Sequence, residues 1–243
     1  METVPPLSHS EMPAFLEPVM HPSQGNLSVA KDSYALPFSF YFPLRSKGNA
    51  FYKRAFDIFL SSTLILLIFP WFLPLAALLI KLESKGPVFF RQKRYKKGEE
   101  VFTCLKLRTM CVNDEADRVA ARKDDARITK LGGFLRRTHL DELPQLFNVF
   151  LGDMSLIGPR PHMVSENLAF APLINYYSIR HNVKPGMTGL AQVLGFTGHV
   201  TDIKVMEKRV EQDIYYIKKW SPLLDLRIIG LTILKLLHIK QAN

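Results

Sequence analysis

The chain has 243 residues, of which 47% are hydrophobic and 22% charged, and its formal net charge is +10. This composition excludes a globally disordered chain and allows one domain of ordinary size with a packed core. The excess of Lys and Arg favours a polyanionic partner, such as nucleic acid, an anionic membrane surface or a phosphorylated substrate, and composition alone does not choose among them.

Residues 1–48 have the composition of a tail. Prolines interrupt every helical or strand period, and scattered Ser and Gly residues add turn chemistry. We therefore expect a Pro-rich N-terminal tail over this range, ahead of the first regular element.

Residues 55–80 form a long apolar stretch with one charge, Asp57, near its start. As an α-helix this stretch would be about 39 Å long, more than the hydrocarbon core of a bilayer requires. Pro70 and Pro74 favour a kink, and basic residues flank both ends, whereas a spanning helix carries them mainly on one side. The residues alone leave open a re-entrant helix that returns to the cytoplasmic face and a kinked transmembrane helix.

The rest of the chain, from about residue 87, predicts a folded body. Two short strands are expected around a turn at 96–100, and residues 131–152 form an amphipathic segment with Gly at both ends. Further helices are expected over 114–122, 164–181 and 204–220.

Residues 222–239 are strongly apolar and contain only three Asp, Lys or Arg residues: Asp225, Arg227 and Lys235. This charge content disfavours a membrane span. An interfacial helix lying on the bilayer explains the pattern, and a buried core helix is the alternative.

Two adjacent carboxylates, Asp141 and Glu142, lie at the start of a predicted helix with Pro144 in its first turn. One interpretation is structural, since acidic residues satisfy the N–H groups of a helix N-terminus. The nearby cations Arg136 and Arg160 favour a second interpretation, a site for a metal-bound diphosphate. In such a site a carboxylate can attack phosphorus or bind Mg²⁺.

Other basic residues are candidates for phosphate contacts. Lys106 and Arg108 lie two apart in a predicted strand and so point to one face, which is either a phosphate contact or a solvated surface. Two prolines stiffen the loop on both sides of Arg160. The basic cluster over 91–97 is typical of binding to anionic lipid headgroups, and the histidines show no metal-ligand spacing.

Five stretches, in one order, resemble the bacterial sugar transferase family, the monotopic phosphoglycosyl transferases. They are KRAFDIFLS at 53–61, GPVFFRQKRYKKGEEVFTCLKLRTM at 86–110, ITKLGGFLRRTHLDELPQLFNVFLGDMSLIGPRPH at 128–162, RHNVKPGMTGLAQV at 180–193 and DIYYIKKWSPLLDLRIIGLTILKLL at 213–237. Together they cover roughly residues 50–238.

The resemblance implies an α+β fold that is mainly helical. We expect a re-entrant membrane helix over 49–85, then a compact catalytic domain over 86–243 with a few short strands and interfacial amphipathic helices, the last one C-terminal. The implied location is the bacterial inner (cytoplasmic) membrane, with the catalytic domain on the cytoplasmic face.

The implied activity is transfer of glucose- or galactose-1-phosphate from a UDP-sugar to undecaprenyl phosphate, the initiating step of exopolysaccharide or surface glycan synthesis. The expected cofactor is Mg²⁺. The expected partners are the UDP-sugar, undecaprenyl phosphate and membrane lipids, without nucleic acid, and homodimer formation stays open. The alternatives are the same chemistry with an N-acetylated or bacillosamine-type sugar, and a basic membrane-associated adaptor in which Asp141 and Glu142 only cap a helix.

The resemblance also implies roles for single residues. Asp141 matches the family nucleophile and metal ligand, and Glu142 matches its partner in a catalytic dyad. Arg136 and Arg160 match phosphate-binding arginines, and Lys106 and Arg108 match a basic strand more loosely.

Overall fold

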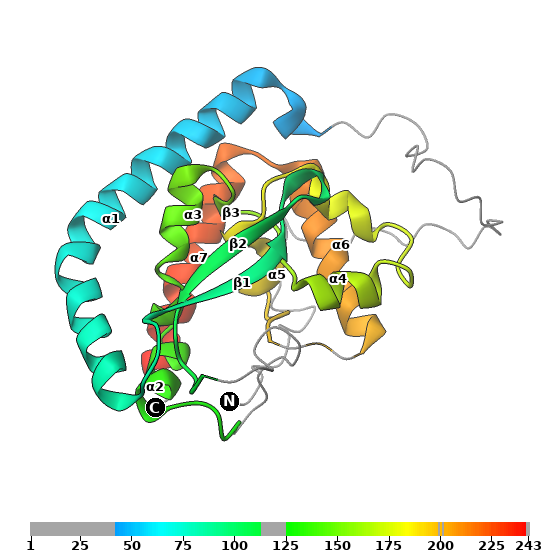
Figure 1. Cartoon of the computed structure of the whole chain (residues 1–243). Helices are drawn as coiled ribbons and strands as arrows, with labels where there is room; N and C mark the ends of the chain where they lie inside the picture. The colour runs from blue at the N-terminus through cyan, green and yellow to red at the C-terminus, as the bar shows by residue number, and fades with distance from the viewer. Residues whose placement is uncertain (1–41, 113–124, 199, 201, 242–243) are drawn as a thin grey trace.

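A long helix, α1 (Lys47–Glu83), curves along one side of the molecule, and the other elements form a body beside it (Figure 1). The computed structural model describes residues 42–112, 125–198, 200 and 202–241. Within these ranges the fold is mainly helical with a few short strands, as the sequence predicts. The helix predicted over 114–122, and most of the tail expected over 1–48, lie outside the described residues.

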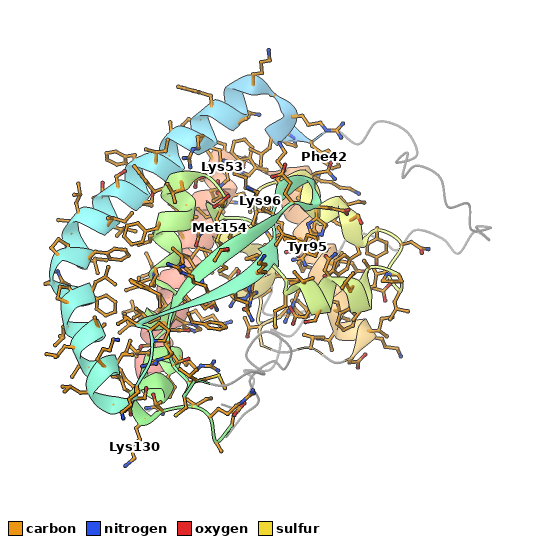
Figure 2. All side chains as sticks on the ribbon, in the orientation of Figure 1. Phe42, Lys53, Tyr95, Lys96, Lys130 and Met154 are labelled. Carbon is orange, nitrogen blue, oxygen red and sulfur yellow. The ribbon has the colours of Figure 1, made fainter. Side chains whose placement is uncertain are left out.

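Helix α1 continues through both internal prolines over 37 residues. It is the one helix, among the residues described, that is long and apolar enough to cross a membrane, and only 17% of its apolar window is buried. Side chains project outward along the whole arc, as Figure 2 shows. The large hydrophobic residues on this exposed surface include Phe51, Phe59, Leu66, Trp71, Leu75, Leu78 and Leu82.

Both ends of α1 are attached to the same body. Near the N-terminal end, Nζ of Lys53 lies 2.8 Å from Oδ2 of Asp225, and both side chains are buried. At the C-terminal end, Arg108 donates to the carbonyl oxygens of Ser84 and Lys85 at 2.6 Å each. A straight helix of this length would hold its ends about 55 Å apart, whereas α1 curves, as Figure 1 shows.

The predicted strand pair is confirmed as β1 (Phe89–Tyr95) and β2 (Val101–Leu107), which pair antiparallel. The turn between them contains η3 (Lys97–Glu99), where Gly98 adopts a φ of 75° that favours glycine. A second pair, β3 (Ser155–Ile157) and β4 (Gly186–Thr188), is parallel and was not predicted.

The amphipathic segment over 131–152 is interrupted. It contributes α2 (Lys130–Arg137), the 3₁₀ turn η4 (Leu140–Glu142) and α3 (Gln145–Leu151). His139 adopts a left-handed φ of 56° between α2 and η4, and Pro144 precedes α3 because it has no N–H to donate. Asp141 and Glu142 therefore lie on a turn ahead of the helix, and their predicted place at the helix start was wrong.

The helix predicted over 164–181 is also divided. It forms α4 (Val164–Phe170) and the 3₁₀ helix η5 (Tyr177–Asn182), because Pro172 removes a backbone donor between them. The helix expected over 204–220 is confirmed as α6 (Ile203–Lys219). The short elements η2 (Pro43–Arg45) and α5 (Leu190–Val193) complete the set with the C-terminal helix α7 (Pro222–Gln241).

The main core lies where α3, the parallel strands, α6 and α7 meet. Its most buried side chains include Leu146, Val149, Ile157, Ile217 and Ile228. Helix α7 turns Leu224 and Ile228 into this core, but its outer face exposes Leu223, Leu226, Ile233, Leu234 and Leu237. The C-terminal helix is therefore buried on one face only.

Candidate active site

The candidate site forms where strand β2, turn η4 and the loop at 158–161 meet. Each of the three supplies one member of a charged cluster. Lys106 of β2 donates to Oε1 of Glu142 at 2.6 Å. Arg160 of the loop donates to both carboxylate oxygens of Glu142, at 2.6 Å and 3.2 Å.

Glu142 is held in its ionised form by these contacts. Burial alone would raise the pKa of its carboxyl, but Arg160 and Lys106 outweigh burial and hold the pKa well below its usual range. The two cations thus share one carboxylate, which leaves a net charge of +1, and the three side chains form one connected unit.

Asp141 has a different environment. Its side chain is buried, with 7% of the residue exposed, and within the described residues its carboxylate accepts no hydrogen bond. Burial raises its pKa to about 6, while the charges of Lys106, Arg136 and Arg160 oppose that shift. A carboxylate with nearby cations but no bonded partner is available to a ligand or a reaction centre.

Arg136 reaches the site from the last turn of α2. Its Nε donates to Oγ1 of Thr109 at 2.7 Å, which fixes the guanidinium beside Asp141 without a hydrogen bond between them. The close packing needs Gly132, because a Cβ there would lie 2.0 Å from the carbonyl oxygen of Thr109. The sequence did not predict this role for Thr109, which directly follows the basic residues Lys106 and Arg108.

Arg108 has no place in this cluster. Strand β2 ends at Leu107, so the alternation that predicted a shared face with Lys106 stops there. The Arg108 guanidinium instead contacts the carbonyl oxygens of Ile80, Ser84 and Lys85 at the end of α1. The structure brings together five of the six predicted site residues: Asp141, Glu142, Lys106, Arg136 and Arg160.

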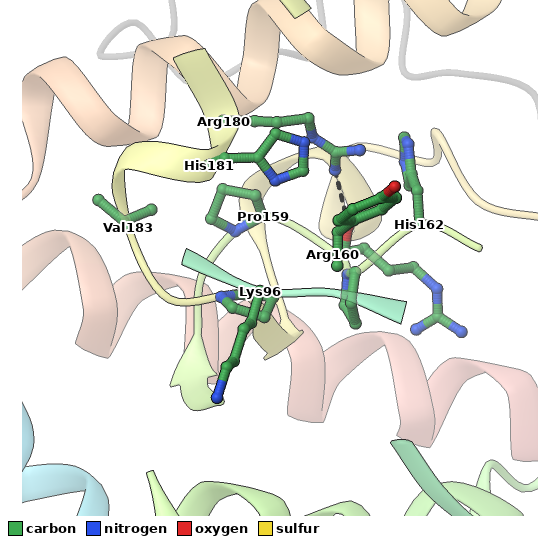
Figure 3. Close-up of a pocket in the computed structure, with 10 residues that line it drawn as sticks. Lys96, Pro159, Arg160, His162, Arg180, His181 and Val183 are labelled. Atoms are coloured by element: carbon green, nitrogen blue, oxygen red, sulfur yellow. Dashed lines mark hydrogen bonds between the residues drawn. The ribbon is translucent and has the colours of Figure 1, made fainter. Parts of the chain in front are cut away.

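Arg180 supports the loop from behind and was not predicted as a site residue. Its Nη2 donates to the carbonyl oxygen of Arg160 at 2.6 Å, and Figure 3 shows the side chain directed toward that residue. The pocket beside the loop has a volume of about 10 Å³, roughly the space of one water molecule. This pocket is too small for a substrate. Arg180 begins the stretch 180–193, which resembles the family. That resemblance is the only sequence signal that could have identified Arg180 as a site residue.

The donor set at the site fits a hard divalent cation. No group of three or more His, Cys, Asp or Glu side chains suited to a metal occurs in the part of the chain that the structure describes. Mg²⁺, however, is usually bound through one or two carboxylates together with substrate phosphates. The buried, unbonded carboxylate of Asp141 has the chemistry of such a ligand.

Comparisons with known proteins give a matching family model and several named relatives. A family model described as bacterial sugar transferase matches residues 48–239. A UDP-glucose:undecaprenyl-phosphate glucose-1-phosphate transferase of Klebsiella pneumoniae is 50% identical over 188 residues, which are 77% of this chain and 40% of the relative. A protein of the same name from Caulobacter vibrioides is 46% identical over 191 residues, 78% of this chain and 71% of the relative.

A third relative differs in its sugar. The UDP-N-acetylgalactosamine-undecaprenyl-phosphate N-acetylgalactosaminephosphotransferase of Aeromonas hydrophila is 44% identical over 192 residues, which are 78% of this chain and 44% of that protein. The chain thus spans about two fifths of the length of two of these three relatives.

Proposed function

Because the chain belongs to the bacterial sugar transferase family, we propose that it transfers a hexose-1-phosphate, from UDP-glucose or UDP-galactose, to undecaprenyl phosphate. The observation that carries the proposal is the contrast between two adjacent carboxylates, an unbonded Asp141 and a Glu142 bonded to Lys106 and Arg160. The names of the relatives support the choice of donor and acceptor. The transfer would initiate the synthesis of an exopolysaccharide or another surface glycan.

In the proposed reaction, a carboxylate oxygen of Asp141 attacks the sugar-bearing phosphorus. A bond forms between that oxygen and phosphorus, the bond from phosphorus to the bridging oxygen breaks, and UMP leaves with the electron pair. A phosphate oxygen of undecaprenyl phosphate then attacks the same phosphorus and releases the Asp141 carboxylate. This covalent route suits one water-soluble and one membrane-bound substrate, because the two need not bind together.

The site's own residues supply what this route requires. With a pKa of about 6, Asp141 is mostly ionised at neutral pH and needs no base to become a nucleophile. The guanidinium groups of Arg136 and Arg160 reduce the repulsion between the carboxylate and the diphosphate. Arg160 has five N–H donors, so its two bonds to Glu142 leave others for a phosphate oxygen.

We also propose that Asp141 holds Mg²⁺ together with oxygens of the diphosphate. The support is its buried carboxylate, which lacks a bonded cation among the described residues. When bound, the metal would neutralise the charge that develops as the diphosphate bridge breaks. Glu142 either helps to position this ion or takes a proton from the incoming group.

For α1 we propose a re-entrant path, with both ends on the cytoplasmic face of the inner membrane. The support is that both ends attach to one body, through Lys53 and through the carbonyl oxygens bound by Arg108, while the outer surface between them is apolar. The exposed apolar face of α7 supports an interfacial position for the C-terminal helix.

One experiment tests the proposed function. Purified full-length protein is incubated with undecaprenyl phosphate, Mg²⁺ and a panel of UDP-sugars that includes the N-acetylated ones, and UMP release is measured. Release with UDP-glucose or UDP-galactose is expected; release with an N-acetylated sugar alone would move the proposal to that sugar. No release with any member would overturn it.

The covalent step has its own test. With sugar-labelled donor and no lipid acceptor, wild-type protein should retain label and lose it when undecaprenyl phosphate is added. Turnover without any trapped label, following ternary-complex kinetics, would contradict the covalent route but not the transfer.

A further inference from the structure

The loop that carries Arg160 is fixed through its backbone. The three successive carbonyl oxygens of 159–161 accept hydrogen bonds from the backbone N–H of Gly186, Nη2 of Arg180 and Nη1 of Arg94, in that order. Two of these donors are arginine side chains from η5 and β1, which are distant in sequence. Residues outside the loop therefore fix its backbone at Arg160 and at the two prolines that flank it.

The donor to Arg160 is one half of a buried ion pair. Nη2 of Arg180 lies 2.8 Å from Oδ2 of Asp213 in α6, and the side chains of both residues are 2% exposed. The same Nη2 donates to the carbonyl oxygen of Arg160 at 2.6 Å. Asp213 thus supplies the countercharge that allows a guanidinium to stay buried beneath the loop.

This arrangement is more elaborate than packing alone requires. Buried ion pairs contribute little net stability compared with apolar side chains of similar volume. The Nε of Arg180 is also buried without a hydrogen-bond partner among the described residues, which is unfavourable. What the pair provides is one donor directed at one carbonyl oxygen, that of the residue whose side chain holds Glu142.

We propose that Arg180 and Asp213 are positioning residues of the transfer reaction, which hold the backbone of Arg160 so that its guanidinium meets both Glu142 and the donor diphosphate. The inference rests on the proposed function, because it takes Arg160 as a phosphate contact. Neither Arg180 nor Asp213 touches the substrate in this account; both act only through Arg160.

A double-mutant cycle tests the proposal. Arg180→Lys keeps the charge beside Asp213 but removes the guanidinium, whose Nη2 donates both to Asp213 and to the carbonyl oxygen of Arg160. We expect kcat/KM for the UDP-sugar to fall about ten- to a hundredfold, as a displaced contact of this kind does. In an Arg160→Ala background the same change should cost less than about twofold, because the residue through which it acts is gone.

Arg209→Lys is the matched control. Arg209 is as buried as Arg180, at 3% exposed, and donates to the carbonyl oxygen of Gly198. Its charge acts on Arg160 and Asp213, but within the described residues it donates no hydrogen bond to the loop at 158–161, so the control separates that hydrogen bond from a buried positive charge nearby. We expect it to lower the melting temperature about as much as Arg180→Lys while leaving kcat/KM within about threefold of wild type.

Equal losses from Arg180→Lys in the wild-type and Arg160→Ala backgrounds would overturn the positioning role, as would an equal loss in the Arg209→Lys control. If Arg180→Lys does not fold, Asp213→Asn, which keeps an oxygen acceptor for Arg180, is taken through the same cycle with the same two outcomes. A wild-type protein that transfers no sugar phosphate overturns the proposed function itself, whereas transfer with additive losses overturns only this inference.

Discussion

Asp141 and Glu142 are neighbours in the chain, but only the carboxylate of Glu142 is bonded to cations. Burial raises the pKa of Asp141 to about 6, whereas Arg160 and Lys106 outweigh burial at Glu142 and lower its pKa. Two titratable groups with pKa values moved in opposite directions are typical of sites in which the groups have different tasks. The first two predictions follow from this contrast.

Asp141→Asn should reduce turnover on the order of 10⁴-fold, because an amide is not a nucleophile and the covalent route has no substitute. UMP release measures the loss. Asp153→Asn is the control, since Asp153 forms a partly exposed ion pair with Lys96 and is not part of the charged cluster, and it should keep near-wild-type turnover. An Asp141→Asn enzyme within tenfold of wild type would exclude Asp141 as the nucleophile.

The same two carboxylates should affect stability in opposite directions. In metal-free buffer above pH 6, Asp141→Asn should raise the free energy of unfolding, on the order of 2 kcal/mol, because it removes a buried charge whose pKa is raised. The gain should shrink as the pH falls below 6 and vanish below pH 3.8, where Asp141 is protonated in both the folded and the unfolded chain. Glu142→Gln should lower the free energy of unfolding by about 3 kcal/mol, because Lys106 and Arg160 lose their countercharge. Urea titrations of both variants measure the effects, and changes of the same sign above pH 6 would refute this account.

Removal of divalent metal should abolish transfer. The attack of a carboxylate on a diphosphate brings two anions together. Among the described residues no cationic side chain is bonded to the Asp141 carboxylate, so a metal ion is needed to reduce the repulsion. Turnover in excess EDTA should be undetectable and should return on adding Mg²⁺, with UMP release as the measurement. Full turnover in EDTA would remove the metal from the proposal.

Acid should destabilise the fold partly through His181. Burial lowers the pKa of this imidazole to about 4, and its Nε2 lies 3.0 Å from Oδ1 of Asn167. Below pH 6.5 His181 is protonated in the unfolded chain but stays neutral in the folded chain. The free energy of unfolding therefore falls from pH 6.5 down to about pH 4. Between pH 7 and pH 5 this contribution is about 2 kcal/mol. In His181→Gln the fall between these pH values should be smaller by that amount. Between pH 7 and pH 8 the two proteins should behave alike, and an undiminished fall in the variant would contradict the prediction.

The two ends of α1 should be accessible from the same side of the membrane. Lys47→Cys and Lys85→Cys are made one at a time in a background without Cys104 and Cys111. An impermeant thiol reagent should label neither site in spheroplasts and both in inside-out vesicles. Labelling of one site only in either preparation would show a spanning helix.

The elements with strong local patterns could be predicted from the sequence. Helix α6 has the 3.6-residue period over 17 residues, and β1 and β2 flank a recognisable turn. The pairing of β3 with β4 could not be predicted, because each strand has only three residues. Their register comes from the close packing of Gly158 on Gly186.

The site was predictable by residue type more than by geometry. Asp141 and Glu142 stand out as adjacent carboxylates among cations, but their turn depends on the left-handed His139, which has no clear sequence signal. The direction of Arg108 depends on where β2 ends. The link from Asp213 through Arg180 to Arg160 joins residues 33 and 20 positions apart, so only the tertiary fold reveals it.

The curvature of α1 bears on which membranes can host the protein. A spanning helix must match the thickness of the hydrocarbon core, and a mismatch forces tilting or local deformation of the lipid. A bowed helix whose two ends are attached to one body, by Lys53 and by Arg108, has its depth fixed by that body. In the re-entrant arrangement its apolar arc displaces lipid from a single leaflet, and the thickness of the opposite leaflet imposes no length on it.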